Sequence, residues 1–235
     1  MPLTLVQQEG TDVMQEVELH KTLYHPNIIR YFGSHQAKNN ICIMMEHAQL
    51  GSLKQVILKA EDRGETLSRL PYEHIISFSR QILKGLNYLH TRQKPIIHRD
   101  LRAVNVLIDR NRKVKIADFG ISKQLNTMAS SSGFDTDVGN IYWKSPELIK
   151  SERVGRKVDI WSLGVTILEM IYVTPPFFKL EGYQWMYRVT RDPAKPPEIP
   201  TFVDRRLQHL VTYCLTYDAD NRKSAEWLLQ WLQWL

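Results

Sequence analysis

The sequence has very little cysteine: Cys42 and Cys214 are the only two in 235 residues. Two cysteines cannot form the disulfide framework of small secreted domains, so a reducing compartment is indicated. The opening stretch, MPLTLVQQ, is too short for a signal peptide and lacks a basic start. We therefore expect a cytoplasmic protein.

The chain also lacks a long hydrophobic run and any block of like charge. Its most apolar window, IWSLGVTILEMIYV, contains Glu169 and stops at Pro175, which predicts a buried helix and no membrane association. Lys and Arg number 31 against 25 Asp and Glu, and the net charge of +6 is spread along the chain. This mild balance gives little support for nucleic-acid binding, while acidic or phosphorylated partners stay open.

With 43% hydrophobic residues, the chain can bury a sizeable core as one domain or two lobes. Asp12 and Gln15 resemble a capping box that begins a helix through VMQEVELHKTL. The runs IIRYF and NICIMM predict short strands separated by a loop, GSHQAKNN. The polar stretch EHAQLGSL then suggests a crossing between lobes.

A long helix and a hairpin follow. The stretch YEHIISFSRQILKGLNYLH predicts a helix because apolar residues recur along it at helical spacing. NVLI and KVKIA, separated by DRNR, predict a β-hairpin. Helical patterns dominate from there to the end, so a small β-containing front and a mainly helical rear are expected.

The hairpin carries a constellation of polar residues. Asn105 precedes its first strand and Asp118 ends its second, so strand pairing brings both side chains to the same open end. Two hard oxygen ligands there suit Mg²⁺ rather than zinc. Asp100, in the preceding loop, is placed to accept a hydroxyl hydrogen beside a metal-bound phosphate. The alternative is three unrelated polar loop residues.

These residues stand in HRDLRAVN, DFG and SPE, which resemble the catalytic loop, metal motif and closing motif of eukaryotic protein kinases. HPNIIRYFG, MEHAQLGSL and GRKVDIWSLG look most like the Ser/Thr branch, especially the mitogen-activated protein kinase kinase kinases. The resemblance implies an α+β, bilobal protein-kinase-like fold. It would comprise a truncated small lobe over 1–45, a hinge over 46–50, and a complete, mainly helical large lobe over 51–235.

The resemblance also implies site residues. Asp100 would be the catalytic base, and Asn105 and Asp118 would hold Mg²⁺. Met45 would be the gatekeeper and Leu107 the floor of the adenine pocket. The hinge would run from Glu46 to Ala48. ATP is the implied second cofactor, and a protein, such as a downstream kinase, is the implied substrate.

Further roles concern the activation segment and the helical lobe. Arg99 would receive a phosphate on that segment, the candidate carriers being Thr127, Ser130, Ser131, Ser132 and Thr136. A polar linker is the alternative for this Ser/Thr run. Asp159 would brace the catalytic loop through backbone N–H groups, and Glu147 would pair with Arg222 unless both are surface charges.

The chain departs from the kinase pattern at its front. No glycine-rich loop or ATP-gripping lysine precedes the first helix. Glu16 stands where the partner of that lysine belongs, and MPLTLVQQ resembles a remnant of the lysine strand, with Thr4 near the lysine position. His20 replaces an apolar residue of the internal spine, and we expect it to be packed and neutral.

Other departures affect specificity. Arg102, grouped with the catalytic residues, stands where Ser/Thr kinases usually have Lys. Asn140 replaces the Thr of the familiar GTPYW, and Tyr142 takes the place of the basic residue typical of tyrosine kinases. Three interpretations follow: a Ser/Thr kinase, slow or silent as written; a pseudokinase-like interaction module; or a truncated product of a full kinase.

Overall fold

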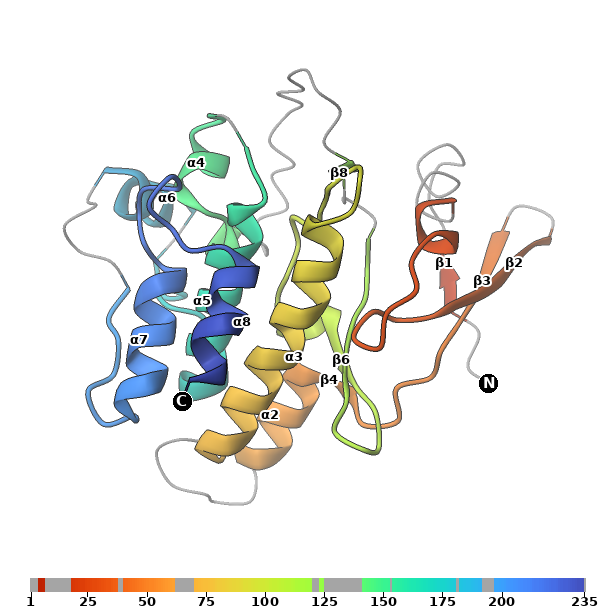
Figure 1. Ribbon diagram of the computed structural model, residues 1–235, viewed down its shortest axis with the longest axis horizontal. Coiled ribbons are helices and arrows are strands. Elements are labelled where there is room, and N and C mark those ends of the chain that lie inside the picture. The colour runs from red at the N-terminus through yellow and green to blue at the C-terminus, as the bar shows by residue number, and fades with distance from the viewer. Residues whose placement is uncertain are drawn as a thin grey trace.

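The computed structural model describes residues 4–6, 18–37, 40–61, 70–119, 123–124, 141–152, 154–180, 182–191 and 197–234. Figure 1 shows strands β1 to β3 on one side of the molecule and most of the helices on the other. β1 (Thr4–Val6), β3 (Asn40–Met45) and β2 (Tyr31–Ala37) form one antiparallel sheet in that order. The opening stretch does contain a strand, in which Thr4 pairs with Ile43; that it is a remnant of the lysine strand stays a prediction.

One predicted strand was misplaced. We expected a strand over residues 28–32 and a loop over 33–40, but β2 begins at Tyr31 and continues through Ala37. Ile28 and Ile29, each 1% exposed, lie against β7 (Val114–Ile116) instead. The Ile29 N–H donates to the Ile116 carbonyl at 2.9 Å, and Ile28 forms a parallel bridge with Ile116. Burial against a distant strand thus overrides the local β pattern.

The predicted hairpin is present. β6 (Val106–Ile108) pairs with β7 in antiparallel register, Val106 opposite Ile116, and β4 (Gly51–Ser52) adds to the other edge of β6. The Asp109 carboxylate closes the turn by accepting from the N–H groups of Asn111 and Lys113 at 2.8 and 2.9 Å. A further short ladder joins β5 (Ile96–Ile97) to β8 (Lys123–Gln124).

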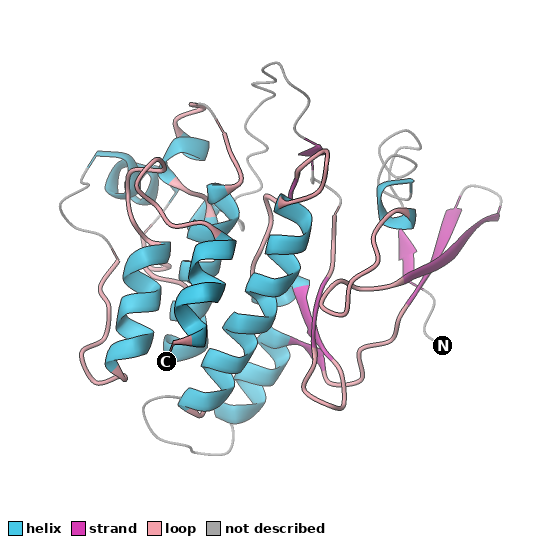
Figure 2. Cartoon of the chain, in the orientation of Figure 1, coloured by secondary structure: helices cyan, strands magenta, loops and turns pink. Residues whose placement is uncertain are grey.

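The predicted long helix is α3 (Tyr72–His90), which follows the shorter α2 (Leu53–Glu61) in the chain; Figure 2 shows the helices in cyan. The apolar stripe of α3 is at most 3% exposed and consists of Ile75, Phe78, Ile82, Leu86 and Leu89. At Gly85 a Cβ atom would come within 2.7 Å of the Ile116 side chain and 3.0 Å of the Asn27 carbonyl. Glycine therefore lets α3 lie directly against β7.

The rest of the large lobe is helical. After α4 (Pro146–Ile149) come α5 (Lys157–Tyr172), α6 (Gly182–Arg191), α7 (Arg205–Cys214) and α8 (Ala225–Gln233), with short 3₁₀ turns at Ala103–Asn105 and Ile141–Trp143. α5 is buried nearly all round, as its continuous apolar sequence predicts. No helix in the described ranges is both long and apolar enough to span a bilayer.

Glu147 and Arg222 form the predicted ion pair. The Arg222 Nη1 and Nη2 atoms lie 2.7 and 3.1 Å from the two Glu147 carboxylate oxygens, and both residues are buried. The guanidinium also donates to three backbone carbonyls and lies over the Trp161 ring at 5.1 Å. This satisfied network ties α4 to α5 and to the segment before α8.

Candidate active site

The loop between β5 and β6 is fixed by hydrogen bonds to Asp159, in the first turn of α5. Its carboxylate accepts the backbone N–H groups of His98 at 2.9 Å and Arg99 at 2.8 Å, and contacts His90 Nε2 at 2.8 Å. Complete burial opposes ionisation of Asp159, but the hydrogen bond from His90 and nearby charge outweigh it and lower its pKa. The predicted bracing of this loop is confirmed, and it includes the left-handed backbone of Arg99, φ 69°.

Asp100 and Asn105 are in direct contact. Asn105 Nδ2 donates to the Asp100 carbonyl at 2.9 Å and to Asp100 Oδ2 at 2.8 Å. Because both bonds use the amide nitrogen, Asn105 Oδ1 is left as an acceptor. Arg102 Nε lies 3.4 Å from Asp100 Oδ1. Burial nevertheless raises the pKa of Asp100, against the opposing charges of Arg102 and His98.

Asp118 joins the same site through the hairpin. The Ala117 N–H donates to the Asn105 carbonyl at 2.9 Å, so Asp118 directly follows the open end of the β6–β7 ladder. Its backbone turns into the left-handed region, φ 63°, and its side chain is exposed. The charge of Asp118 adds a minor contribution to the raised pKa of Asp100, after burial. The structure thus brings the three predicted residues together.

The donor set fits Mg²⁺ bound together with phosphate. Asn105 Oδ1 and the Asp118 carboxylate are hard oxygen donors, which this ion prefers. Within the described residues no group of three or more His, Cys, Asp or Glu side chains is arranged to hold a metal by itself. Water and phosphate oxygens would complete the coordination, as is usual for Mg²⁺ beside a nucleotide.

The segment predicted to be the hinge is joined to the hairpin by Lys115, a buried lysine that sequence reasoning missed. Lys115 Nζ lies 2.7 and 2.8 Å from the two Glu46 carboxylate oxygens, and the Glu46 N–H donates to the Arg30 carbonyl at 2.8 Å. Lys115 stands opposite Leu107 in the ladder, so both face the hinge. The sequence did hold one sign of this buried ion pair, because Lys115 stands between the apolar strand residues Val114 and Ile116. Met45, at the end of β3, and the buried Ala48 flank Glu46.

His20 packs into the interior beside the DFG phenylalanine. Its ring meets Phe119 edge-on at 4.5 Å between centroids, and Phe119 meets His98 at 5.0 Å. His20 is 4% exposed and its Nε2 atom has no hydrogen-bond partner in the described part of the chain. Burial, reinforced by the nearby His98, lowers the pKa of His20 to about 4. The expected packing of His20 is confirmed, and the lowered pKa agrees with a neutral ring at pH 7.

Two arginines border the site. Arg99 Nε is buried without a hydrogen-bond partner among the described residues, and burial lowers the pKa of this guanidinium. The Arg102 guanidinium lies 6.0 Å from the centre of the Trp143 ring, which links the catalytic loop to the segment before α4. Glu16, Asn140 and the five candidate phosphate carriers lie outside the described residues.

Comparison with known proteins agrees with this geometry. The protein kinase domain model matches residues 4–234, so the chain belongs to the protein kinase family. It is 35% identical over 226 residues to "Mitogen-activated protein kinase kinase kinase 1a" of Physcomitrium patens, covering 96% of this chain and 28% of the relative. It is 35% identical over 217 residues to "Mitogen-activated protein kinase kinase kinase 3" of Homo sapiens, and the match covers 91% of this chain and 33% of the relative. The identity to "Cell division control protein 7" of Schizosaccharomyces pombe is 30% over 218 residues, and the match covers 93% of this chain and 19% of the relative. The chain therefore spans about a third or less of these relatives.

Proposed function

We propose that the chain is a serine/threonine protein kinase that transfers the γ-phosphate of ATP to hydroxyl groups of a protein. The observation that carries the proposal is the contact of Asn105 with Asp100 beside the open end of the hairpin that leads to Asp118. Phosphoryl transfer depends mainly on positioning and electrostatics, and this arrangement provides both a hydroxyl acceptor and metal-binding oxygens.

Each residue has a distinct task in this proposal. Asn105 Oδ1 and Asp118 hold Mg²⁺, which when bound neutralises charge on the phosphates. Asp100 does not bind the metal; it accepts the hydrogen of the substrate hydroxyl and orients the oxygen for attack. Arg102 keeps the Asp100 carboxylate in place from 3.4 Å.

Nucleotide binding and control involve neighbouring residues. The backbone from Glu46 to Ala48 hydrogen-bonds adenine, beside the gatekeeper Met45 and above Leu107. The proposal that Arg99 receives an activation-segment phosphate is supported by its buried, unpartnered Nε. The lobe boundaries 1–45, 46–50 and 51–235 stay a prediction, in keeping with the end of β3 and the start of α2.

The place of this activity in the cell follows from the relatives. Two of the three relatives are named as mitogen-activated protein kinase kinase kinases, which supports assigning this chain to the same kind of cascade, with a downstream kinase as substrate. The low cysteine content supports a cytoplasmic location. The Ser/Thr preference rests on these relatives and on HPNIIRYFG and GRKVDIWSLG in the sequence.

Radiolabelled ATP with Mg²⁺ and a generic protein acceptor tests the proposal. Strand β1 contains no lysine, and each charge-assisted phosphate contact is worth about 1.5–3 kcal/mol, so transfer should be far below the ~1–100 s⁻¹ of ordinary kinases. Asp100→Asn should reduce the remaining rate by about 10² or more. Transfer that Asp100→Asn leaves unchanged would overturn the assigned role.

A second candidate function is a kinase-like module that binds partners without transferring phosphate. The observation that favours it is that strand β1, which pairs with β3, contains no lysine. A thermal-shift titration with ATP and Mg²⁺ separates the two candidates. A saturable shift that Asp118→Asn abolishes supports nucleotide chemistry, whereas no shift supports the module.

A further inference from the structure

A ridge of aromatic and cationic side chains runs from the start of β2, through the turn before it, to the C-terminal end of α3. We call it the basic ridge and define it as Phe32, Arg30, Tyr24, Tyr88 and Arg92. The Arg30 guanidinium lies 5.5 Å from the Phe32 ring centre and 5.4 Å from that of Tyr24. The Tyr24 N–H donates to the Tyr88 hydroxyl at 2.9 Å, and Arg92 Nη1 donates to the same hydroxyl at 2.7 Å. These contacts make the ridge continuous.

The two arginines of the ridge are held in place by aromatic rings. Arg30 contacts two rings, and Arg92 lies 5.3 Å from the Tyr88 ring centre besides bonding its hydroxyl. Stacking restricts a guanidinium but leaves its N–H groups at the edge free to bind a planar anion. A ligand would therefore lose less side-chain entropy here than on freely moving arginines.

More positive charge surrounds the ridge. His25 stacks on Tyr88 at 4.9 Å, and burial together with the charges of Lys84, Lys115 and Lys113 lowers the pKa of His25. Lys115 is neutralised by Glu46, but Lys84 and Lys113 are exposed. Across the described ranges, no carboxylate forms an ion pair with Arg30, Lys84, Arg92 or Lys113.

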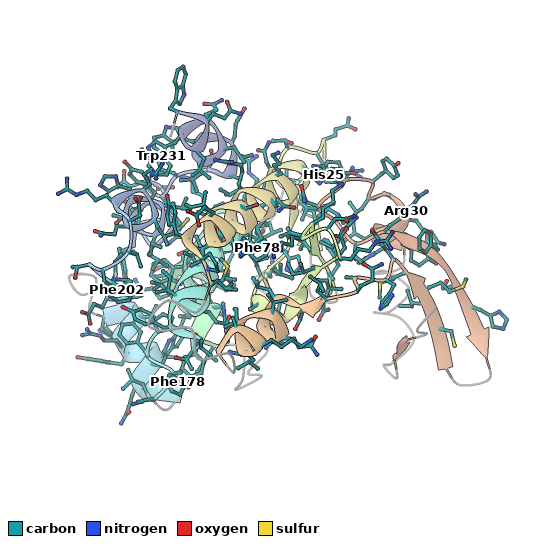
Figure 3. All side chains as sticks on the ribbon, turned by 90° about the horizontal axis from the view of Figure 1, so that it is seen from below. His25, Arg30, Phe78, Phe178, Phe202 and Trp231 are labelled. Atoms are coloured by element: carbon teal, nitrogen blue, oxygen red, sulfur yellow. The ribbon has the colours of Figure 1, made fainter. Side chains whose placement is uncertain are left out.

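The ridge is also exposed, and it meets the candidate site only at its edge, where the Arg30 backbone bonds Glu46. Tyr24 is 74% exposed and Phe32 50%. Figure 3 shows His25 and Arg30 along the same edge of the molecule, away from Phe178 on the opposite edge. The hydrogen bonds and the ion pair that join Asp100 to Asn105 and Arg102 involve none of the ridge residues.

We propose that the basic ridge docks an acidic segment, rich in Asp or Glu, of a partner protein. Unpaired cations around exposed apolar rings complement carboxylates on a flexible chain, and arginine edges bind carboxylates in a bidentate manner. Nucleic acid fits less well because bases need free aromatic faces. Here Arg30 occupies a face of Tyr24 and of Phe32, and both His25 and Arg92 cover Tyr88.

Fluorescence anisotropy with three labelled probes tests this docking surface. The probes are a peptide of alternating Glu and Gly, the same peptide with Gln for Glu, and an oligouridylate of equal length. The Glu peptide should bind, more weakly as salt is added, and the Gln peptide should not. Arg30→Ala and Arg92→Ala should each weaken binding about tenfold, since each removes one bidentate contact.

Matched variants make the result specific. Lys179→Ala, next to Phe178 on the opposite edge, removes one exposed positive charge and should leave affinity unchanged. Asp100→Asn should also bind the Glu peptide normally, so failure of the phosphotransfer proposal does not affect this one. Lys84→Glu, at an exposed helix position, should weaken binding without unfolding the chain. Equal affinity of the arginine variants and the unmodified chain, or tighter binding of oligouridylate than of the Glu peptide, would overturn the proposal.

Discussion

Replacing His20 by leucine should stabilise the chain at neutral pH and stabilise it more as the pH falls. His20 is 4% exposed, packs edge-on against Phe119, and buries an Nε2 atom that has no hydrogen-bond partner in the described structure. Leaving a buried polar atom unsatisfied costs about 1–3 kcal/mol. Leucine has a similar volume and no polar atom, so His20→Leu should recover an amount of this order.

The pH dependence follows from the lowered pKa. The unfolded chain takes up a proton on this side chain near pH 6.5, whereas folded His20 does so only near pH 4. Between these values the unfolded state binds more protons, so stability decreases as the pH falls. Each pH unit is worth about 1.4 kcal/mol, which gives about 3 kcal/mol lost over the interval. His20→Leu does not suffer this loss.

Urea denaturation at a series of pH values measures both effects. The difference in unfolding free energy between His20→Leu and the unmodified chain should be positive at pH 7.5 and should widen steadily below about pH 6.5. His35→Leu, at an exposed position on β2, is the matched control and should show no such widening. A difference that is constant with pH would refute the buried, neutral histidine.

Three other predictions follow from single contacts. Lys115→Met should leave the Glu46 carboxylate unpaired beside the hinge and cost about 1–3 kcal/mol in chemical denaturation, with weaker nucleotide binding in calorimetry. Glu147→Ala should cost about 3–5 kcal/mol, because it leaves the buried Arg222 guanidinium without its anion; a loss below 1 kcal/mol would contradict a buried pair. Thr4→Lys, in the strand register opposite Ile43, should tighten ATP binding about tenfold or more by adding one charge-assisted phosphate contact.

The sequence predicted the elements whose periodicity is long and regular. The spacing from Ile75 to Leu89 was enough to define α3, and the symmetry of Asn105 and Asp118 about one turn located the hairpin and its open end. Contacts between distant segments were harder to predict. Ile28 pairs with β7 because the fold places that strand beside it, and no local pattern specifies such a partner.

In the candidate site, too, residues in local motifs were predicted and contacts between distant segments were not. Motifs located Asp100, Asn105 and Asp159, because each lies in a short segment with a fixed spacing. The Lys115–Glu46 pair joins residues 69 positions apart and depends on how the hairpin meets the hinge. The basic ridge likewise assembles from β2, the turn before it and α3, so its arginines look like ordinary surface charges in the sequence.

The central claim is that Asp100, Asn105 and Asp118 form one site. The most direct test is to measure Mn²⁺ binding, in place of Mg²⁺, by electron paramagnetic resonance in the presence of ATP. Asn105→Ala and Asp118→Asn should each weaken nucleotide-dependent Mn²⁺ binding, because each removes an oxygen ligand. Asp100→Asn should retain that binding while losing phosphate transfer. Mn²⁺ binding that none of these changes affects would contradict a common phosphate position shared by the three side chains.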